Sequence, residues 1–155
     1  MAFTATSGIP IRAGRSHDWP AVRNLLDEAG LPIADLNAES MQHFLIASGG
    51  ADAAHSVVGA AALQSSGKVG LLRSLVIASS ARSKGLGSRL VREIECQAKA
   101  AGITELWLLT IDAAAFFAGH GYEASKRDAA PTAIRETPEF SKLCPDSAVL
   151  MFKSI

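Results

Sequence analysis

The sequence predicts a mixed α/β fold, with one central mixed sheet and helices on both of its faces. Segments with strand-like apolar patterns alternate with segments of helical period, in the order strand, helix, three strands, helix, strand, helix, strand. The 155 residues match the length of one domain and can bury a core without disulfides. We therefore expect residues 9–153 to form a single domain and residues 1–8 to be an N-terminal extension.

The first strand and first helix follow from local signals. Residues 9–13 contain Pro10, which cannot donate to a strand ladder, so this strand is expected at an edge. Ser16 or Asp18 can cap the helix that follows, and its first turn contains a proline. Gly30 ends that helix.

Three strands are predicted in the middle of the chain. Residues 31–42 read as a loop with one or two helical turns, followed by strands at 43–47 and 57–63. Glycine- and serine-rich turns separate these strands from each other and from the next one. Residues 69–77 are almost continuously apolar, which is typical of a central strand covered on both faces.

The second half of the chain alternates helices with strands. An apolar stripe of helical period predicts a helix over about residues 85–101, which Gly102 ends. The remaining predicted elements are a buried strand at 105–110, a short helix at 112–119, an extended piece at 121–123, a helical turn at 137–139 capped by Thr137, and a last strand at 148–152.

The charge balance argues against a polyanion as partner. Fifteen Lys and Arg residues offset fifteen Asp and Glu residues, so neither nucleic acid nor an anionic membrane surface is an expected partner. The charges are nonetheless segregated, because residues 53–92 contain no acidic residue. That stretch carries six basic residues: Lys68, Arg73, Arg82, Lys84, Arg89 and Arg92.

Other signals suggest a cytoplasmic enzyme-like protein. The longest apolar stretch, residues 106–122, is broken by polar residues, and the N-terminus lacks the pattern of a secretory signal. Cys96 and Cys144 do not form a metal-type pair, so we expect two reduced thiols and no metal site.

One loop carries the pattern of an anion site. Residues 82–88 read Arg-Ser-Lys-Gly-Leu-Gly-Ser and lie between a buried strand and an amphipathic helix. Glycines allow close backbone approach, and the N–H groups and dipole of a helix start favour a phosphate. The spacing fits neither a Walker A loop nor a dinucleotide fingerprint, whose third glycine would fall at Leu90. The alternative is a glycine-softened turn before a helix.

The pattern Arg82-x-x-Gly85-x-Gly87 resembles the coenzyme A pyrophosphate loop of the GNAT superfamily of N-acetyltransferases. Residues 113–122, Ala-Ala-Ala-Phe-Phe-Ala-Gly-His-Gly-Tyr, resemble a second signature near the end of that fold. The order of elements is also similar, over about residues 9–153. This resemblance implies a mostly antiparallel mixed sheet with a splayed cleft for acetyl-CoA.

Further residues narrow the resemblance. The segments 71–75, 108–110, 131–135, 139–140 and 143–148 resemble the arsinothricin N-acetyltransferases of bacterial arsenic-resistance operons. This resemblance implies acetylation of the amine of a small acidic amino-acid-like substrate, such as arsinothricin or phosphinothricin.

The superfamily resemblance also implies how the coenzyme is held and how the acetyl group moves. Acetyl-CoA is the co-substrate, and the substrate amine attacks its thioester directly, without a covalent enzyme intermediate. The backbone around Leu75 and Val76 is expected to pair with the pantetheine arm. The pyrophosphate is expected on Arg82, Ser83, Lys84, Gly85, Leu86, Gly87 and Ser88.

The sequence departs from the superfamily pattern at its acid and base. Phe117 stands where many relatives have a tyrosine acid, and core packing is the alternative reading of this residue. Tyr122 is not assigned the acid role. Strand 69–77 contains no carboxylate, which leaves His43, Glu39 and His120 as titratable candidates. A histidine beside apolar residues, as at His43, is more often structural than a base.

Arg73 interrupts the apolar strand 69–77, and a guanidinium on a central strand is rarely buried without an anion. Its planar fork suits a carboxylate or a phosphonate-like group, so we expect Arg73 to bind the acidic group of the substrate, with Ser74 adding a hydroxyl. The alternative is an ion pair with an acidic side chain elsewhere in the fold. Arg135 could be a second such contact with the substrate, but it reads more readily as a surface helix residue.

Two other functions stay open. The same fold could acetylate a protein or peptide amine, or it could bind acyl-CoA without catalysis, which would agree with the missing acid and base. Homodimers are frequent among similar proteins, so a homodimer is a further expectation.

Overall fold

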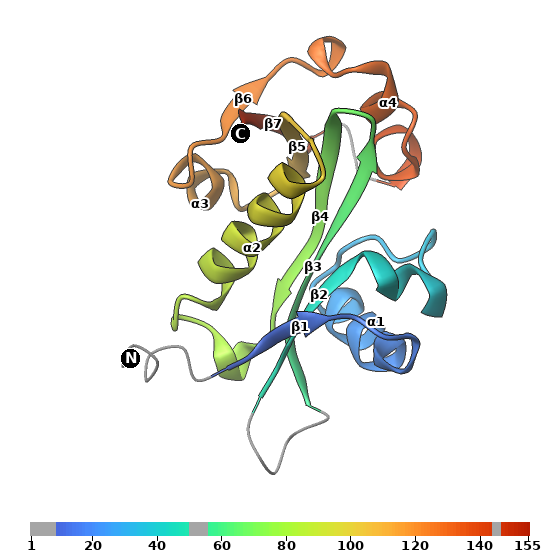
Figure 1. The fold of residues 1–155 in the computed structure, drawn as a ribbon, viewed down its shortest axis with the longest axis vertical. Coiled ribbons are helices and arrows are strands. Elements are labelled where there is room, and N and C mark those ends of the chain that lie inside the picture. The colour runs from blue at the N-terminus through green and yellow to red at the C-terminus, as the bar shows by residue number, and fades with distance from the viewer. Residues whose placement is uncertain (1–8, 50–55, 144–146) are drawn as a thin grey trace. The chain divides into compact units, whose positions relative to one another are not determined.

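The computed structural model describes residues 9–49, 56–143 and 147–155. The predicted N-terminal extension and Cys144 lie outside the described residues. In the described part of the chain, seven strands form one sheet in the order β1-β2-β3-β4-β5-β7-β6 (Figure 1). The strands are β1 (Ile11–Ala13), β2 (Phe44–Ser48), β3 (Val57–Ser66), β4 (Val69–Ile77), β5 (Glu105–Thr110), β6 (Glu123–Ser125) and β7 (Val149–Ser154).

The sheet is mixed and mostly antiparallel, as the sequence and the family resemblance predict. The pairs β1–β2, β2–β3, β5–β7 and β6–β7 are antiparallel, whereas β4 and β5 are parallel. β3 and β4 are connected by a tight turn at Gly67, whose φ of 61° is a left-handed conformation that glycine adopts without strain. β1 lies at the edge, where Pro10 predicted it.

Three helices lie where the sequence predicted them, but the predicted helical turn at 137–139 is replaced by α4 (Thr132–Arg135) before it and by a π-helical turn, Glu139–Leu143, after it. The other helices are α1 (Trp19–Glu28), α2 (Leu86–Ala100) and α3 (Ala114–Ala118). α1 ends in a Schellman motif, because the Gly30 N–H donates to the Asp27 carbonyl and the Leu31 N–H donates to the Leu26 carbonyl. Short 3-10 turns fill several loops, and one of them, Ala38–His43, moves the start of the second strand from residue 43 to Phe44.

The chain divides into two compact units. One contains the residues up to Ala62 together with Ser74–Val91, and the other contains Leu63–Arg73 and Arg92–Ile155. β3, β4 and α2 each contribute residues to both units. The prediction of one domain over residues 9–153 stays a prediction.

The first unit has helices on both faces of its strands. Val22 and Leu26 of α1 pack in one buried cluster with Ile46 of β2 and with Ala60 of β3. Gly59, the neighbour of Ala60, points to the opposite face, since side-chain directions alternate along a strand. A Cβ built on Gly59 would lie 3.2 Å from the Leu86 side chain, so the first turn of α2 packs closely against that face.

The second unit has its own core. Leu71 of β4, Trp107 of β5 and Leu150 of β7 form a buried cluster with Ile134 of α4, and Phe140 packs against that cluster. The Trp107 and Phe152 rings stack with centroids 4.8 Å apart. The segment after α4 is therefore held against the face of β4 on which Leu71 lies.

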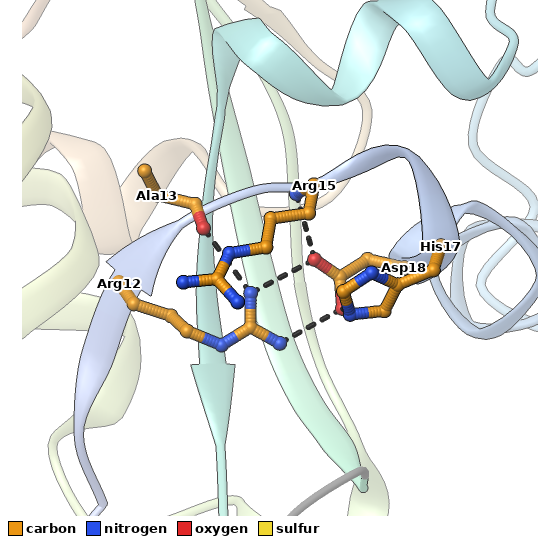
Figure 2. A network of polar contacts seen from close by, with 5 residues as sticks. All are labelled: Arg12, Ala13, Arg15, His17 and Asp18. Atoms are coloured by element: carbon orange, nitrogen blue, oxygen red, sulfur yellow. Dashed lines mark hydrogen bonds and ion pairs between the residues drawn. The ribbon is translucent and has the colours of Figure 1, made fainter.

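A polar network joins the end of β1 to the start of α1 (Figure 2). Both terminal guanidinium nitrogens of Arg12, Nη1 and Nη2, donate to the Asp18 carboxylate at 2.8 Å, and the Arg15 backbone N–H donates to the same carboxylate at 2.8 Å. The sequence predicted Ser16 or Asp18 as the cap of α1, and Asp18 does occupy the N-cap position. Its carboxylate nevertheless makes no cap bond to α1, because it accepts hydrogen bonds from Arg12 and from the Arg15 backbone instead.

Candidate functional site

The predicted anion loop adopts backbone conformations that suit an anion. Ser83 has a φ of 66° and Gly85 a φ of 78°, both left-handed, and α2 begins directly afterwards at Leu86. The Arg89 N–H donates to the Gly85 carbonyl at 3.1 Å, which makes Gly85 the residue that opens the helix. The N–H groups of the first turn have no carbonyl within the helix to donate to, so they favour an anion at this end.

Two contacts fix this loop to the strands of the same unit. Leu86 is buried against the face of β3 that Gly59 leaves open. The Arg82 Nε donates to the Ile77 carbonyl at 3.1 Å, so the first residue of the loop is tied to the end of β4. The cationic side chains of Arg82 and Lys84 remain exposed.

The predicted coenzyme residues on β4 follow a strained residue. Ser74 lies in the middle of β4 with a φ of 59°, a left-handed conformation that is unusual for a serine inside a strand. The parallel register with β5 covers Val69–Leu71, and Leu75 and Val76 lie beyond it. The Val76 side chain belongs to the core cluster of the first unit, so the strand is anchored from that side.

Arg73 forms a buried ion pair. Its Nε lies 3.2 Å from Oε1 of Glu139, and the exposed fractions of the two side chains are 0% and 4%. Its Nη1 donates to Oε1 of Gln64 on β3 at 3.2 Å. Glu139 therefore supplies the anion that the sequence required for Arg73, which supports the ion-pair alternative. Binding of a substrate by Arg73 and Ser74 stays a prediction.

The tyrosine and phenylalanine of the second signature serve packing. Phe117 is buried, and its ring meets the Tyr122 ring edge-on with centroids 5.7 Å apart. The Tyr122 hydroxyl donates to Oε2 of Glu95 at 2.9 Å, and Lys153 pairs with the same oxygen at 3.0 Å. Burial, reinforced by the Glu95 charge, raises the pKa of Tyr122 far above its usual range. This phenol is therefore poorly suited to give up a proton.

The remaining titratable candidates are dispersed. His43 and Glu39 are exposed on the 3-10 turn Ala38–His43, whereas the His120 ring packs beside Phe116 with centroids 4.8 Å apart. Their roles as bases stay predictions. Arg135 is exposed on α4, as the sequence suggested.

The described residues contain neither a membrane-spanning helix nor a cluster of metal ligands. Within residues 9–49, 56–143 and 147–155, no helix is long and apolar enough to cross a membrane. The same residues contain no group of three or more metal-ligating side chains. Cys96 is a free, exposed cysteine on α2.

Sequence reasoning missed the part played by Glu139. The sequence gives only a weak signal that Glu139 is buried, namely that its segment also contains the apolar residues Ile134 and Phe140. Nothing in the spacing connects Glu139 with Arg73, which lies sixty-six positions earlier. The partner of Arg73 becomes visible only when the segment folds onto β4.

Comparison with known families gives one match to a family model. The model of the acetyltransferase (GNAT) domain matches residues 40–124, which include the anion loop and the segment 113–122. No curated protein matches the sequence significantly.

Solved structures share the fold. N-acetylglutamate synthase from Neisseria gonorrhoeae, complexed with coenzyme A and N-acetyl-glutamate, is 22% identical with a TM-score of 0.80 over 94% of this chain and 35% of its own. Rv2747 from Mycobacterium tuberculosis, in complex with CoA, is 22% identical with a TM-score of 0.76 over 94% of this chain and 99% of its own. An acetyltransferase from Streptococcus agalactiae is 19% identical with a TM-score of 0.72 over 96% and 99% of the two chains. This chain thus spans about a third of the N-acetylglutamate synthase chain.

Proposed function

Because the chain belongs to the GNAT acetyltransferase family, we propose that it is an acetyl-CoA-dependent N-acetyltransferase. We propose as its acceptor the amine of a small acidic amino-acid-like molecule, with arsinothricin and phosphinothricin as the first compounds to try. The observation that carries the proposal is the loop 82–88, which follows β4 and leads into α2 with two left-handed residues, Ser83 and Gly85.

The residues of this loop fit the pyrophosphate of coenzyme A. Left-handed Ser83 and Gly85 turn the backbone so that the helix start faces outward, and the exposed cations of Arg82 and Lys84 lie beside it. The loop and the Leu75–Val76 stretch lie in the same compact unit, and Arg82 ties them together through the Ile77 carbonyl.

The proposed division of labour is mainly one of positioning. Acetyl-CoA supplies an activated acetyl thioester when it is bound. The backbone of Leu75 and Val76 holds the pantetheine arm that carries the thioester, and the loop 82–88 holds the pyrophosphate. The thioester carbon is then presented to the acceptor in one orientation. The acceptor amine must lose a proton before it attacks, for which His43 remains a candidate base besides water.

The acidic acceptor is supported by two likenesses. The segments 131–135 and 143–148 resemble the arsinothricin acetyltransferases, and a structure of the same fold holds N-acetyl-glutamate. Both point to an amino acid with a second acidic group as the acceptor.

Calorimetric titration with acetyl-CoA, followed by mass spectrometry of a mixed panel of amines, tests the proposal. We expect saturable binding of acetyl-CoA and a gain of one acetyl group on an acidic amino acid in the panel. Acetylation of peptides alone would replace the acceptor class. Binding without any acetylated product would indicate an acyl-CoA-binding module, and absence of binding would overturn the proposal.

Substitution of Arg73 by alanine separates its two readings. If Arg73 binds the acidic group of the acceptor, Arg73→Ala raises the acceptor KM by about a hundredfold and leaves acetyl-CoA affinity unchanged, because a charge-assisted bidentate contact is lost. If the Glu139 ion pair is its main role, affinity for acetyl-CoA and thermal stability fall together. The ion pair seen in the structure favours the second result.

A further inference from the structure

We propose that Glu139 is a positioning residue for the coenzyme strand, acting through Arg73 on the backbone of Ser74. The Arg73 clamp is defined here as the Arg73–Glu139 ion pair together with the Arg73–Gln64 hydrogen bond. The inference rests on the proposed function, since it assumes that Leu75 and Val76 hold the coenzyme.

The clamp grips Arg73 from two separate elements. Gln64 belongs to the neighbouring strand β3, and Glu139 opens the π-helical turn Glu139–Leu143. The ion pair at Nε and the hydrogen bond at Nη1 hold the guanidinium at two of its nitrogens, which fixes both its position and its plane. A long side chain held in this way restricts the backbone from which it projects.

The segment that carries Glu139 is itself firmly placed. Ile134 lies in the core cluster with Leu71, which is on the same face of β4 as Arg73 because the two residues are two positions apart. The Thr137 hydroxyl accepts from the Phe140 N–H at 3.3 Å, so Thr137 caps the turn that begins with Glu139. The Arg127 guanidinium lies 5.1 Å from the centre of the Phe140 ring and adds a further contact. Glu139 is therefore a rigid anchor.

Arg73 directly precedes the strained residue. A left-handed serine within a strand is unfavourable by itself, and such a conformation persists only where the surroundings over-determine it. The clamp supplies a restraint on one side of Ser74, and the buried Val76 side chain supplies one on the other. Leu75 lies between these restraints, so the direction of its N–H and C=O groups depends on both.

Glu139→Gln tests the inference, with Glu136→Gln as the matched control. Glu136 is three residues earlier and exposed, so its amide variant changes the same charge without touching the clamp. In the protein without ligand, we expect Glu139→Gln to speed amide hydrogen exchange in residues 74–77 by about tenfold while β7 exchanges at its original rate. The dissociation constant for acetyl-CoA should rise by about tenfold. Glu136→Gln should change neither.

The glycine variant of Ser74 supplies the decisive comparison. Glycine adopts a φ near 59° without strain, so the strand no longer needs the clamp to hold it. In proteins that carry Ser74→Gly, adding Glu139→Gln should change the acetyl-CoA dissociation constant by less than about threefold. A merely structural ion pair would lower stability equally in both backgrounds and show no such suppression.

Three results would overturn the inference. Glu139→Gln could leave amide exchange at residues 74–77 unchanged, or Glu136→Gln could speed that exchange as much as Glu139→Gln does. The third result is a loss of acetyl-CoA affinity on Glu139→Gln that is equally large with and without Ser74→Gly. If Glu139→Gln does not fold, the pair Arg73→Met and Glu139→Leu removes both buried charges and should fold, yet it also lacks the clamp and should show the same fast exchange. A wild-type protein that fails to bind acetyl-CoA would contradict the proposed function alone, because exchange is measured without ligand.

Discussion

Individual polar residues in this protein act mostly by fixing the backbone near them. Asp18, whose side chain is 4% exposed, receives two hydrogen bonds from Arg12 and one from the Arg15 backbone. Glu95 receives the Tyr122 hydroxyl and the Lys153 ammonium in the same manner. Neither carboxylate belongs to the anion loop, so their substitution should affect folding before chemistry.

Asp18→Asn should destabilise the protein by about 2 kcal/mol at pH 7, because it removes charge-assisted hydrogen bonds from a buried acceptor. Hydrogen bonds from Arg12 lower the pKa of Asp18 in the folded state. Its contribution to stability is therefore complete above the unfolded-state pKa of about 3.9 and is lost as the pH falls through the folded-state value.

Urea unfolding of Asp18→Asn and wild type between pH 3 and pH 7 measures this effect. The difference in the free energy of unfolding should be constant down to about pH 5 and should shrink below about pH 4. Asp27→Asn, at an exposed position on α1, is the control and should follow wild type throughout. A difference between Asp18→Asn and wild type that is as large at pH 3 as at pH 7 would contradict the role of the Arg12 pair.

Helix α2 is the element on which the proposed activity depends most. The anion loop leads into its first turn, and Gly102, whose φ is 85°, lies two residues after its last residue, Ala100. Both Gly85 and Gly102 are left-handed, and a Cβ at either position would meet open space. An alanine at either position would therefore be strained in the same way. Only Gly85 lies in the proposed coenzyme loop, so Gly102 serves as the matched control.

Gly85→Ala should weaken acetyl-CoA binding by about tenfold, since the exposed loop relaxes from the left-handed conformation and must recover it on binding. Gly102→Ala should lower thermal stability, because it places an alanine in a left-handed conformation. It should leave the dissociation constant for acetyl-CoA unchanged. Calorimetric titration of both variants makes the comparison. Equal affinities in the two variants would argue against the loop as the pyrophosphate site.

At the scale of the whole molecule, two compact units share β3, β4 and α2, so each of these elements connects the two cores. The predicted coenzyme residues all belong to the unit that contains Ser74–Val91. Because these elements continue from one unit into the other, we expect a ligand on one unit to stabilise the entire fold.

Acetyl-CoA at a hundred times its dissociation constant should stabilise the folded state by about 2.7 kcal/mol. For a chain of this size, that corresponds to a rise in Tm of roughly 5–10 °C, seen as one shifted transition by circular dichroism. Adenosine at the same concentration lacks the pyrophosphate and should leave Tm unchanged. A second transition that stays in place would show that the units unfold independently.

Local patterns in the sequence were enough to predict most of the element order and the place of the loop 82–88 between β4 and α2, but they missed α4. β4 and β5 were predicted with their observed bounds, since continuous apolar runs between turn residues mark buried strands. The loop 82–88 was recognisable because glycine spacing and helix polarity act over a few residues. The hydrogen bonds of the cap residue Asp18 were less predictable. Its carboxylate accepts from Arg12 and from the Arg15 backbone and not from α1, and which donors lie near it depends on how β1 and α1 are placed.

The sequence by itself determined the class of fold, the family and the position of the proposed coenzyme loop, because these depend on periodicity and on contiguous motifs. Only the tertiary structure decided what Arg73 faces. The sequence left open an acidic substrate or an internal carboxylate, and the folded chain places Glu139 3.2 Å from the Arg73 Nε. A buried charge must find a counter-ion, but which counter-ion it finds depends on how segments far apart in the chain pack together.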